Sequence, residues 1–252
     1  RLRFHSDSDL ITTLAKLHAN LHQARQDGLL WRVQSDDYVL EAERYGGAAS
    51  LALCEQLFCI DSGDVFALLE IEEEFSGMHQ RWLYALISID YYAQALFPGE
   101  EERTEFIEKI ANNYISEHSS PSTRSSVQVS LGARFRDLRK SIDVIRRGSP
   151  AVNAWREYLQ ARLAQRESVI AAIRELIKDL PKERSDSVWH SLMHMHSNRL
   201  VQSDPRRHEA VLYDFTRRLE RARQAAKRSN VNQAVPANQV RQEAVVENGQ
   251  DA

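Results

Sequence analysis

Apolar residues recur every three or four positions along most of this chain, which is the spacing of one face of an α-helix. The clearest series is Val127, Leu131, Phe135, Leu138, Ile142 and Ile145. Ser149-Pro150 and Asp204-Pro205 mark two helix starts, because each places proline at the first helical position after a capping residue. Together these patterns predict helices over residues 48–58, 62–75, 82–97, 101–114, 127–145, 150–177 and 205–222. A further helix, with leucines on one face, ends at Gly28.

Three short segments near the N-terminus alternate apolar and polar residues, as strands do. They cover residues 2–5, 30–34 and 38–44, with a Ser-Asp-Asp turn between the last two. From Ser229 the chain turns to Asn, Gln, Val and Ala with scattered charge, which predicts disorder. We therefore expect an α+β fold with a small N-terminal sheet and a mainly helical body. One domain over residues 1–228 would precede a disordered tail over residues 229–252.

Composition and charge exclude few classes of function. The 252 residues carry a net charge of -3, so the chain as a whole makes no case for nucleic-acid binding. No apolar run approaches the length of a membrane helix, no secretory signal is visible, and Cys54 and Cys59 fit no zinc pattern. A cytoplasmic protein is the simplest expectation. The first residue is Arg1 rather than Met, which is consistent with a start that has been cut off.

The run from Tyr38 to Gly47 concentrates chemistry beside a backbone bend. Glu41 and Arg44 come directly before Tyr45 and the Gly46-Gly47 pair. Glycines permit a tight turn or close approach to a ligand, and arginine grips a carboxylate with two parallel hydrogen bonds. The run could therefore hold an anionic group. The simpler alternative is a strand that ends in a turn, with Glu41 and Arg44 as a surface ion pair.

A second cluster places three histidines within seven residues. On a helix, His190, His194 and Asn198 would share one stripe, with Trp189, Leu192, His196 and Leu200 on the opposite side. Such a stripe can present an acid or base to a cavity. The spacing of His190 and His194 also suits zinc, but no glutamate follows His190 and no third ligand is evident. Surface or packing histidines are the alternative.

Two basic runs lie on amphipathic segments. The first holds Arg134, Arg136, Arg139, Lys140, Arg146 and Arg147, and the second extends from Arg206 to Arg228. A solvated helix face explains both. The functional alternative is that these residues bind a peptide or RNA.

Taken together, the motifs resemble one family. Glu41 to Gly47, the segment Phe58-Cys59-Ile60-Asp61-Ser62 and the pattern His194-Met195-His196-Ser197-Asn198-Arg199 resemble the C-terminal domain of class I lanthipeptide dehydratases. This glutamate-elimination domain also occurs as a stand-alone protein in thiopeptide-type bacteriocin biosynthesis. The opening Arg1-Leu2-Arg3-Phe4 is similar to the family's basic strand, usually preceded by more of the domain. The resemblance covers residues 1 to 228.

The resemblance implies a lyase. A partner first esterifies Ser or Thr of a precursor peptide with glutamate from glutamyl-tRNA, and this domain then expels glutamate to leave dehydroalanine or dehydrobutyrine. The implied catalytic residues are Arg44, His194, Glu41 and Arg3, and the implied substrate-binding residues are Arg1, Tyr45, Asn198 and Arg199. Arg44 and Arg3 would grip the glutamyl group, His194 would move protons, and Glu41 would orient Arg44. No metal or organic cofactor is implied.

The resemblance also implies partners and rivals. We expect a precursor peptide, leader plus core, and a separate glutamyl-tRNA-dependent glutamylation protein, with no membrane and no direct tRNA binding. The nearest rival is a thiopeptide pyridine synthase, which joins two dehydroalanines with loss of the leader. That reaction needs no arginine pair for glutamate, so Glu41, Arg44 and His194 together favour elimination. A non-catalytic peptide-binding module is the rival of a different class.

Overall fold

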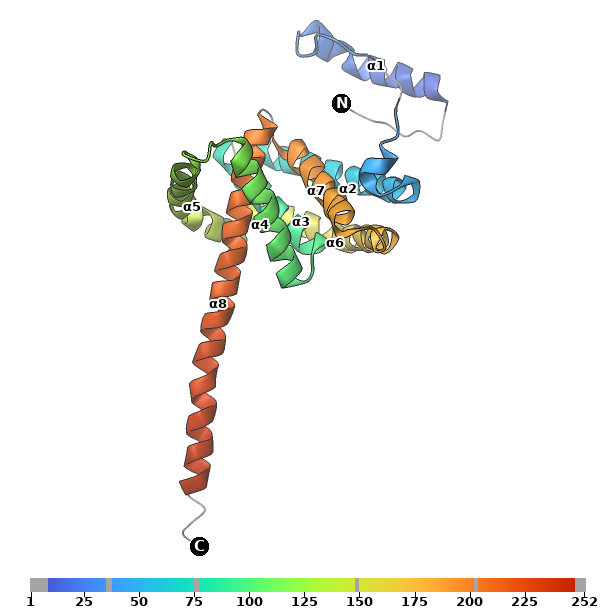
Figure 1. Cartoon of the computed structure of the whole chain (residues 1–252). Coiled ribbons are helices and arrows are strands. Elements are labelled where there is room, and N and C mark those ends of the chain that lie inside the picture. Colours follow the sequence, from blue (N-terminus) through green and yellow to red (C-terminus); the bar gives the residue numbers. More distant parts are fainter. Residues whose placement is uncertain (1–8, 35–37, 75–77, 148–149, 202–203, 248–252) are drawn as a thin grey trace. The chain divides into compact units, whose positions relative to one another are not determined.

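The computed structural model describes residues 9–34, 38–74, 78–147, 150–201 and 204–247, and within these ranges every regular element is a helix (Figure 1). The chain forms two compact units, residues 1–40 and 41–252. The elements are α1 (Leu10–Gln26), the short 3₁₀ turn η1 (Ala42–Tyr45), α2 (Ala48–Glu74), α3 (Met78–Leu96), α4 (Glu100–Glu117), α5 (Arg124–Arg147), α6 (Pro150–Ile177), α7 (Lys182–Leu200) and α8 (Pro205–Glu247).

The expected α+β fold is wrong, because the described ranges contain no strand. The segment 30–34 is irregular, and Trp31 within it is 87% exposed. Residues 38–41 are also irregular, and the chain then enters η1 instead of continuing a strand. A strand is stable only when a neighbour takes its backbone hydrogen bonds, and neither segment has one here. The strand expected at residues 2–5 lies outside the described residues.

Within residues 9–34 and 38–40, the described part of the first unit, the chain forms one helix, α1. The Asp9 carboxylate caps α1 by accepting hydrogen bonds from the backbone N–H groups of Ile11 at 3.3 Å and Thr12 at 3.2 Å. Gly28 follows the helix with a φ of 73°, a left-handed conformation that suits glycine at a helix end. No residue of α1 is buried. Its leucine face therefore contributes nothing to a core within the described structure of this unit.

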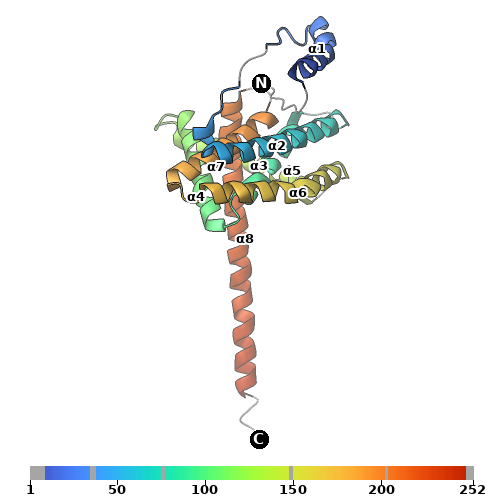
Figure 2. The same ribbon diagram turned by 90° about the vertical axis from the view of Figure 1, so that its right-hand side faces the viewer.

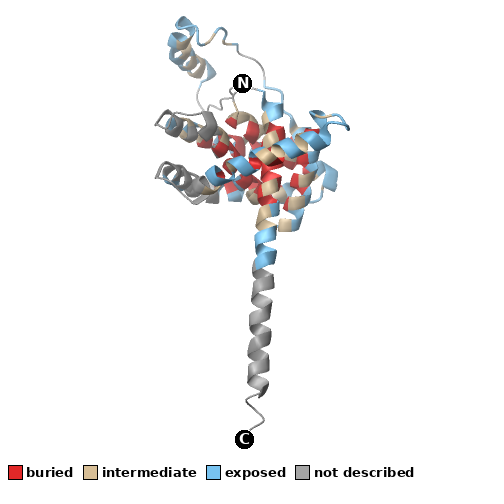
Figure 3. Cartoon of the chain, turned by 90° about the vertical axis from the view of Figure 1, so that its left-hand side faces the viewer, coloured by how far each residue is buried: buried red, intermediate tan, exposed pale blue. Residues whose placement is uncertain are grey.

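The second unit is a bundle around one core. Helices α2 and α6 pack along each other, as do α4 and α8, while α3 contacts both α7 and α8 (Figure 2). The buried residues gather where these helices meet (Figure 3). Aromatic side chains fill much of this space, the largest fully buried ones being Tyr45, Tyr92, Tyr114, Tyr213, Phe97, Phe106 and Phe215. The apolar faces predicted from the helical spacing are thus the faces that pack into the core of this unit.

Two boundaries differ from expectation. The helix start predicted at Asp61-Ser62 is wrong, because α2 continues through it and Ser62 donates its hydroxyl to the Phe58 carbonyl at 2.7 Å. At the other end, the backbone of α8 is helical to Glu247. Helix therefore occupies residues 229–247, where the sequence predicts disorder.

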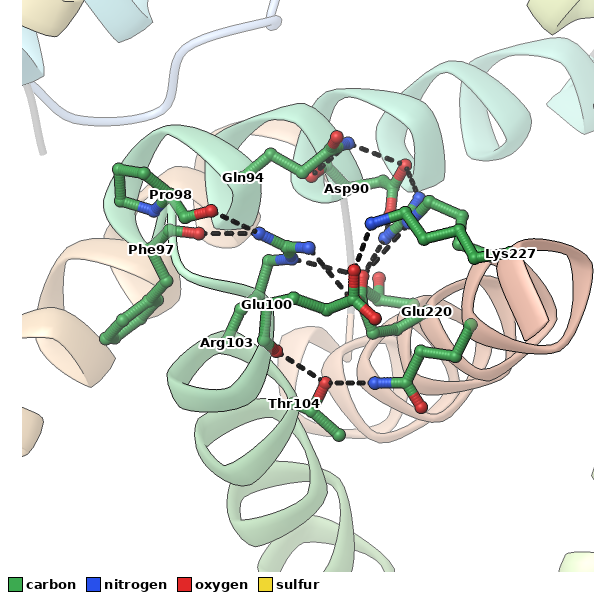
Figure 4. A network of polar contacts seen from close by, with 12 residues as sticks. Asp90, Gln94, Phe97, Pro98, Glu100, Arg103, Thr104, Glu220 and Lys227 are labelled. Atoms are coloured by element: carbon green, nitrogen blue, oxygen red, sulfur yellow. Dashed lines mark hydrogen bonds and ion pairs between the residues drawn. The ribbon is translucent and has the colours of Figure 1, made fainter. Parts of the chain in front are cut away.

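A buried ionic cluster fastens α8 to α3 and α4 (Figure 4). Arg103 of α4 grips Glu220 of α8 with two hydrogen bonds, of 3.1 and 2.9 Å. Arg223 of α8 likewise holds both oxygens of Asp90 on α3, at 2.7 and 2.8 Å. Arg103 also donates to the Phe97 carbonyl at 2.7 Å, at the end of α3. These paired charges fix the register of α8 against α3 and α4, and α4 and α8 both contribute side chains to the site described next.

Candidate functional site

The Gly-Gly pair forms the predicted bend, but it ends a 3₁₀ turn and not a strand. Gly46 has a φ of 81° and Gly47 a φ of 110°, both in the left-handed range that favours glycine. A Cβ atom on Gly46 would lie 2.8 Å from Ile177 Cγ2, closer than packed carbons approach. Gly46 therefore allows η1 to sit directly against the end of α6.

This bend lays Arg44 onto α7. The Arg44 Nε donates to Ser191 Oγ at 3.2 Å, and its Nη1 donates to Glu41 Oε1 at 3.4 Å. The Arg44 side chain is 39% exposed, so the guanidinium is anchored yet reachable from solvent. Tyr45, by contrast, is buried and packs edge-on against Phe58 at 5.4 Å between ring centroids. It supports the turn from beneath and does not face solvent.

The predicted histidine stripe is confirmed. His190, His194 and Asn198 are each partly exposed on one side of α7. The residues expected on the opposite side are all buried, namely Trp189, Leu192, His196 and Leu200. Ser191, which anchors Arg44, comes one residue after His190 and three before His194. The guanidinium and the two stripe histidines therefore share one region of α7.

His194 is held at both ring nitrogens. Its Nδ1 lies 2.7 Å from Glu209 Oε1, and its Nε2 lies 3.0 Å from Asn198 Nδ2. The amide nitrogen can only donate, and an ionised carboxylate can only accept. The neutral ring consistent with both contacts carries its proton on Nδ1 and a lone pair on Nε2. In that tautomer Nε2 is the ring nitrogen able to accept a proton.

Glu209 is fully buried at the start of α8, where a carboxylate needs strong partners. Its Oε1 accepts from Tyr213 at 3.0 Å and from Tyr114 at 3.4 Å, in addition to His194. Arg206 lies 3.8 Å from its Oε2 and donates to the Tyr114 oxygen at 2.6 Å. Burial and the nearby Glu209 charge raise the pKa of Tyr114, so the phenol remains a neutral donor.

His190 completes the cluster. Its Nε2 lies 3.1 Å from the Tyr114 hydroxyl. Burial lowers the pKa of His190, and His194, Arg206 and Arg44 lower it further. Glu209 opposes this shift without reversing it. His190 is therefore neutral at neutral pH and acts on the site by hydrogen bonding.

The remaining predicted residues fall elsewhere. Arg199 points to α2, where its Nε donates to Ser62 Oγ at 3.3 Å and its guanidinium lies 4.7 Å from the Phe58 ring centroid. This contact joins α7 to α2 and leaves a role in substrate binding as a prediction. Arg1 and Arg3 lie outside the described residues.

Sequence reasoning missed Glu209, Tyr114, Arg206 and Ser191. One of them was detectable. Glu209 precedes Leu212 by three residues and Tyr213 by four, so it falls on the same side of the helix as these two buried residues. A carboxylate at an apolar position of an amphipathic helix is unusual, and it indicates a buried charge with a hydrogen-bonding or ionic partner.

A second histidine cluster has the geometry of a nucleophilic triad but lies inside the core. Ser88 Oγ is 2.9 Å from His196 Nε2, and His196 Nδ1 is 3.4 Å from Asp61 Oδ2. All three are buried, and the His196 ring stacks on Tyr92 at 4.4 Å. A peptide carbonyl cannot reach Ser88 there, so the trio is a polar support inside the core, with one hydrogen bond between Ser88 and His196 and a charge contact between His196 and Asp61.

Groups of metal ligands and membrane-spanning helices are both absent from the described part of the chain. Among the described side chains, no group of three or more His, Cys, Asp or Glu residues is arranged to hold a metal ion. Among the described helices, none combines the length and apolar character needed to cross a bilayer.

Comparison with known proteins gives two matches. The family model described as lantibiotic biosynthesis dehydratase C-term matches residues 1–219. The subtilin biosynthesis protein SpaB of Bacillus subtilis is 25% identical over 210 residues, which are 81% of this chain and 19% of SpaB. The chain therefore spans about a fifth of the length of that curated relative. No solved structure matches the chain.

Proposed function

The chain belongs to the lantibiotic biosynthesis dehydratase C-terminal family, and from this premise we propose that it eliminates glutamate from glutamylated Ser or Thr residues of a precursor peptide. The observation that carries the proposal is the convergence on α7 of an anchored arginine, Arg44, and a histidine held as a base, His194. An elimination that expels a carboxylate needs one group of each kind.

The reaction breaks two bonds of the glutamylated residue, Cα–H and Cβ–O, and forms one Cα–Cβ double bond. The base removes the Cα proton of the glutamylated residue, and the electrons of that C–H bond form the Cα–Cβ double bond. The Cβ–O bond to the glutamyl group breaks, and glutamate leaves with the electron pair as a carboxylate. Serine yields dehydroalanine and threonine yields dehydrobutyrine.

Arg44 suits the leaving group. Ser191 and Glu41 fix its Nε and Nη1, so the guanidinium is oriented before substrate arrives. Preorganised cations stabilise charge that develops in a transition state more than mobile ones do. Glu41 is the orienting partner, because its carboxylate contacts Arg44 directly and its side chain remains 42% exposed. Arg1 and Arg3 stay predicted as further glutamyl ligands.

His194 suits the proton transfer. Glu209 accepts the Nδ1 hydrogen, so Nε2 is the nitrogen that takes the Cα proton, once the Asn198 amide that lies 3.0 Å from it turns away. After the transfer, the ring that carries the proton lies 2.7 Å from the buried Glu209 carboxylate. Asn198 then has a second use, because its Oδ1 has no hydrogen-bond partner among the described residues. A half-turn of the amide would let Oδ1 accept from protonated Nε2.

The proposed partners follow from the reaction. The substrate is a precursor peptide that has been glutamylated by a separate, glutamyl-tRNA-dependent protein. The elimination needs no redox chemistry, and the side chains at the site supply the acid, the base and the cation. A protein in the cytoplasm would meet both the peptide and the glutamylating partner.

The test is a set of matched variants on a glutamylated precursor peptide, followed by peptide mass. We expect Arg44→Ala and His194→Ala each to slow the loss of glutamate by at least about 100-fold, the lower range for an oriented cation or a general base. Arg139→Ala is the control, because Arg139 is half exposed and also pairs with a nearby carboxylate, Asp143. Wild-type rates in the Arg44 and His194 variants would overturn the assignment.

A further inference from the structure

The two basic runs of the sequence meet in one cavity that the proposed reaction does not use. Helices α4, α5 and α8 enclose a space of about 500 Å³. Arg136 of the first run lines it from α5, while Arg217, Arg218 and Arg221 of the second line it from α8. Residues about 80 positions apart thus present their guanidinium groups to the same volume, which a solvated helix face does not explain.

The cavity holds more positive than negative charge. Two carboxylates face these four arginines, Glu108 within the lining and the fully buried Asp214 behind it. Asp214 holds Arg217 and Arg218, and Glu108 accepts from Arg221 Nε at 2.6 Å. Arg136 has no ion-pair partner among the side chains that the structure describes. Arg217 is only 5% exposed, and its Nε has no hydrogen-bond partner among those side chains.

A glycine keeps the space open. Gly132 of α5 is buried in the middle of its helix, where glycine costs stability relative to alanine. A Cβ atom there would lie 3.2 Å from Arg218 Nη1 and 3.6 Å from Arg136 Nη1. Any larger side chain would occupy the gap between those two guanidinium groups. The gap between two cations is where an anionic group would sit.

We propose that this cavity binds a carboxylate side chain of an acidic peptide segment. Arginine forks match carboxylates, and the lining residues Asn112, Ser125 and Gln128 offer amide and hydroxyl groups for a peptide backbone. Single-stranded RNA is the less fitting occupant, because none of the lining residues is aromatic and can stack a base.

The position of the cavity deepens the proposed function, on which this step rests. Arg217 follows Glu209 by eight residues on α8, a rise of about 12 Å along the helix. An extended peptide covers that distance with about four residues. The acidic residue would therefore lie at least four positions from the Ser or Thr that reacts at His194. The cavity would hold the peptide while the reacting residue changes.

The experiment is a binding titration with the full 252-residue chain and a fluorescein-labelled decapeptide that alternates Glu and Gly. The matched neutral probe replaces every Glu by Gln. Arg136→Gln and Arg221→Gln each remove one cation from the cavity, while Gly132→Leu fills it without a change of charge. Arg134→Gln is the control, because Arg134 is an exposed arginine of α5 that does not line the cavity.

We expect the acidic probe to bind and the neutral probe not to bind. Arg136→Gln and Arg221→Gln should each weaken binding by about tenfold, the effect of losing one charge-assisted hydrogen bond. Gly132→Leu should weaken binding at least as much because it fills the space, and Arg134→Gln should leave binding unchanged. Equal weakening by Arg134→Gln would show diffuse electrostatics and overturn the proposal. So would unchanged binding in Gly132→Leu, or displacement of the peptide by a lower concentration of oligouridylate than of unlabelled acidic peptide. Since the probe carries no glutamyl ester, the outcome is independent of whether the chain eliminates glutamate.

Discussion

Replacing Glu209 by glutamine isolates the contribution of one buried charge to catalysis. Glutamine keeps the shape of the side chain, and its carbonyl can still accept from Tyr213 and Tyr114. The charge-assisted contact to His194 Nδ1 at 2.7 Å is lost. Such hydrogen bonds contribute about 1.5–3 kcal/mol net. If the loss falls on the transition state, the elimination rate drops by about 10- to 150-fold.

The assay is the rate of glutamate release at saturating peptide, with the fold checked by circular dichroism. Glu117→Gln is the control, because Glu117 also pairs with Arg206, at 2.9 Å, but is 43% exposed and is not one of the two residues that bond the His194 ring. Its rate should stay within about twofold, as for a surface pair. Nitrogen-15 NMR of the imidazole should show the Nδ1–H form in wild type and a loss of that preference in Glu209→Gln. A wild-type rate with an unchanged NMR signature would refute the positioning role.

Three further predictions concern the scaffold. Gly46→Ala should lower the free energy of unfolding by about 2–4 kcal/mol in urea titrations, because its Cβ would meet Ile177 at 2.8 Å in a left-handed backbone; an unchanged midpoint would contradict the turn geometry. Burial alone would raise the pKa of Glu220, but its two arginine partners hold it below the ordinary value of 4.5. The stability it contributes should therefore be present above that pH and fade as pH falls, and Glu220→Gln should flatten this slope. Burial raises the pKa of the Cys54 thiol to about 11, so a thiol reagent at pH about 8 should label exposed Cys59 and spare Cys54 until the chain unfolds.

Periodicity predicted the parts of the fold that depend on one helix face. The series from Val127 to Ile145 lies within α5, and Pro150 begins α6 as expected. The stripe of His190, His194 and Asn198 followed from the same 100° geometry. Each pattern repeats over at least about two turns of helix, which is long enough to identify the apolar side.

The predicted sheet failed because alternation over five to seven residues says nothing about a partner strand. Residues 30–34 and 38–44 have strand-like composition, yet the second segment buries Tyr45 through a 3₁₀ turn. The left-handed conformations of Gly46 and Gly47 decide that outcome locally. The same glycines were correctly predicted to bend the chain beside Arg44.

The site was only partly predictable because some of its residues are far apart in the sequence. Arg44, Glu41 and His194 lie in short motifs, so their residue types drew attention. Tyr114 and Glu209 come from α4 and α8, and only the packing of those helices brings them to α7. A buried carboxylate on an apolar stripe was the one local signal, and it identifies Glu209 without naming its partner.

The most direct test is to incubate the purified chain with a precursor peptide already glutamylated on Ser or Thr, and to follow peptide mass and free glutamate together. The account predicts one glutamate released for each dehydroalanine or dehydrobutyrine formed, with no other protein present. A peptide that keeps its glutamyl esters would contradict the account, most clearly if the same chain converts an already dehydrated peptide into a smaller pyridine-containing macrocycle.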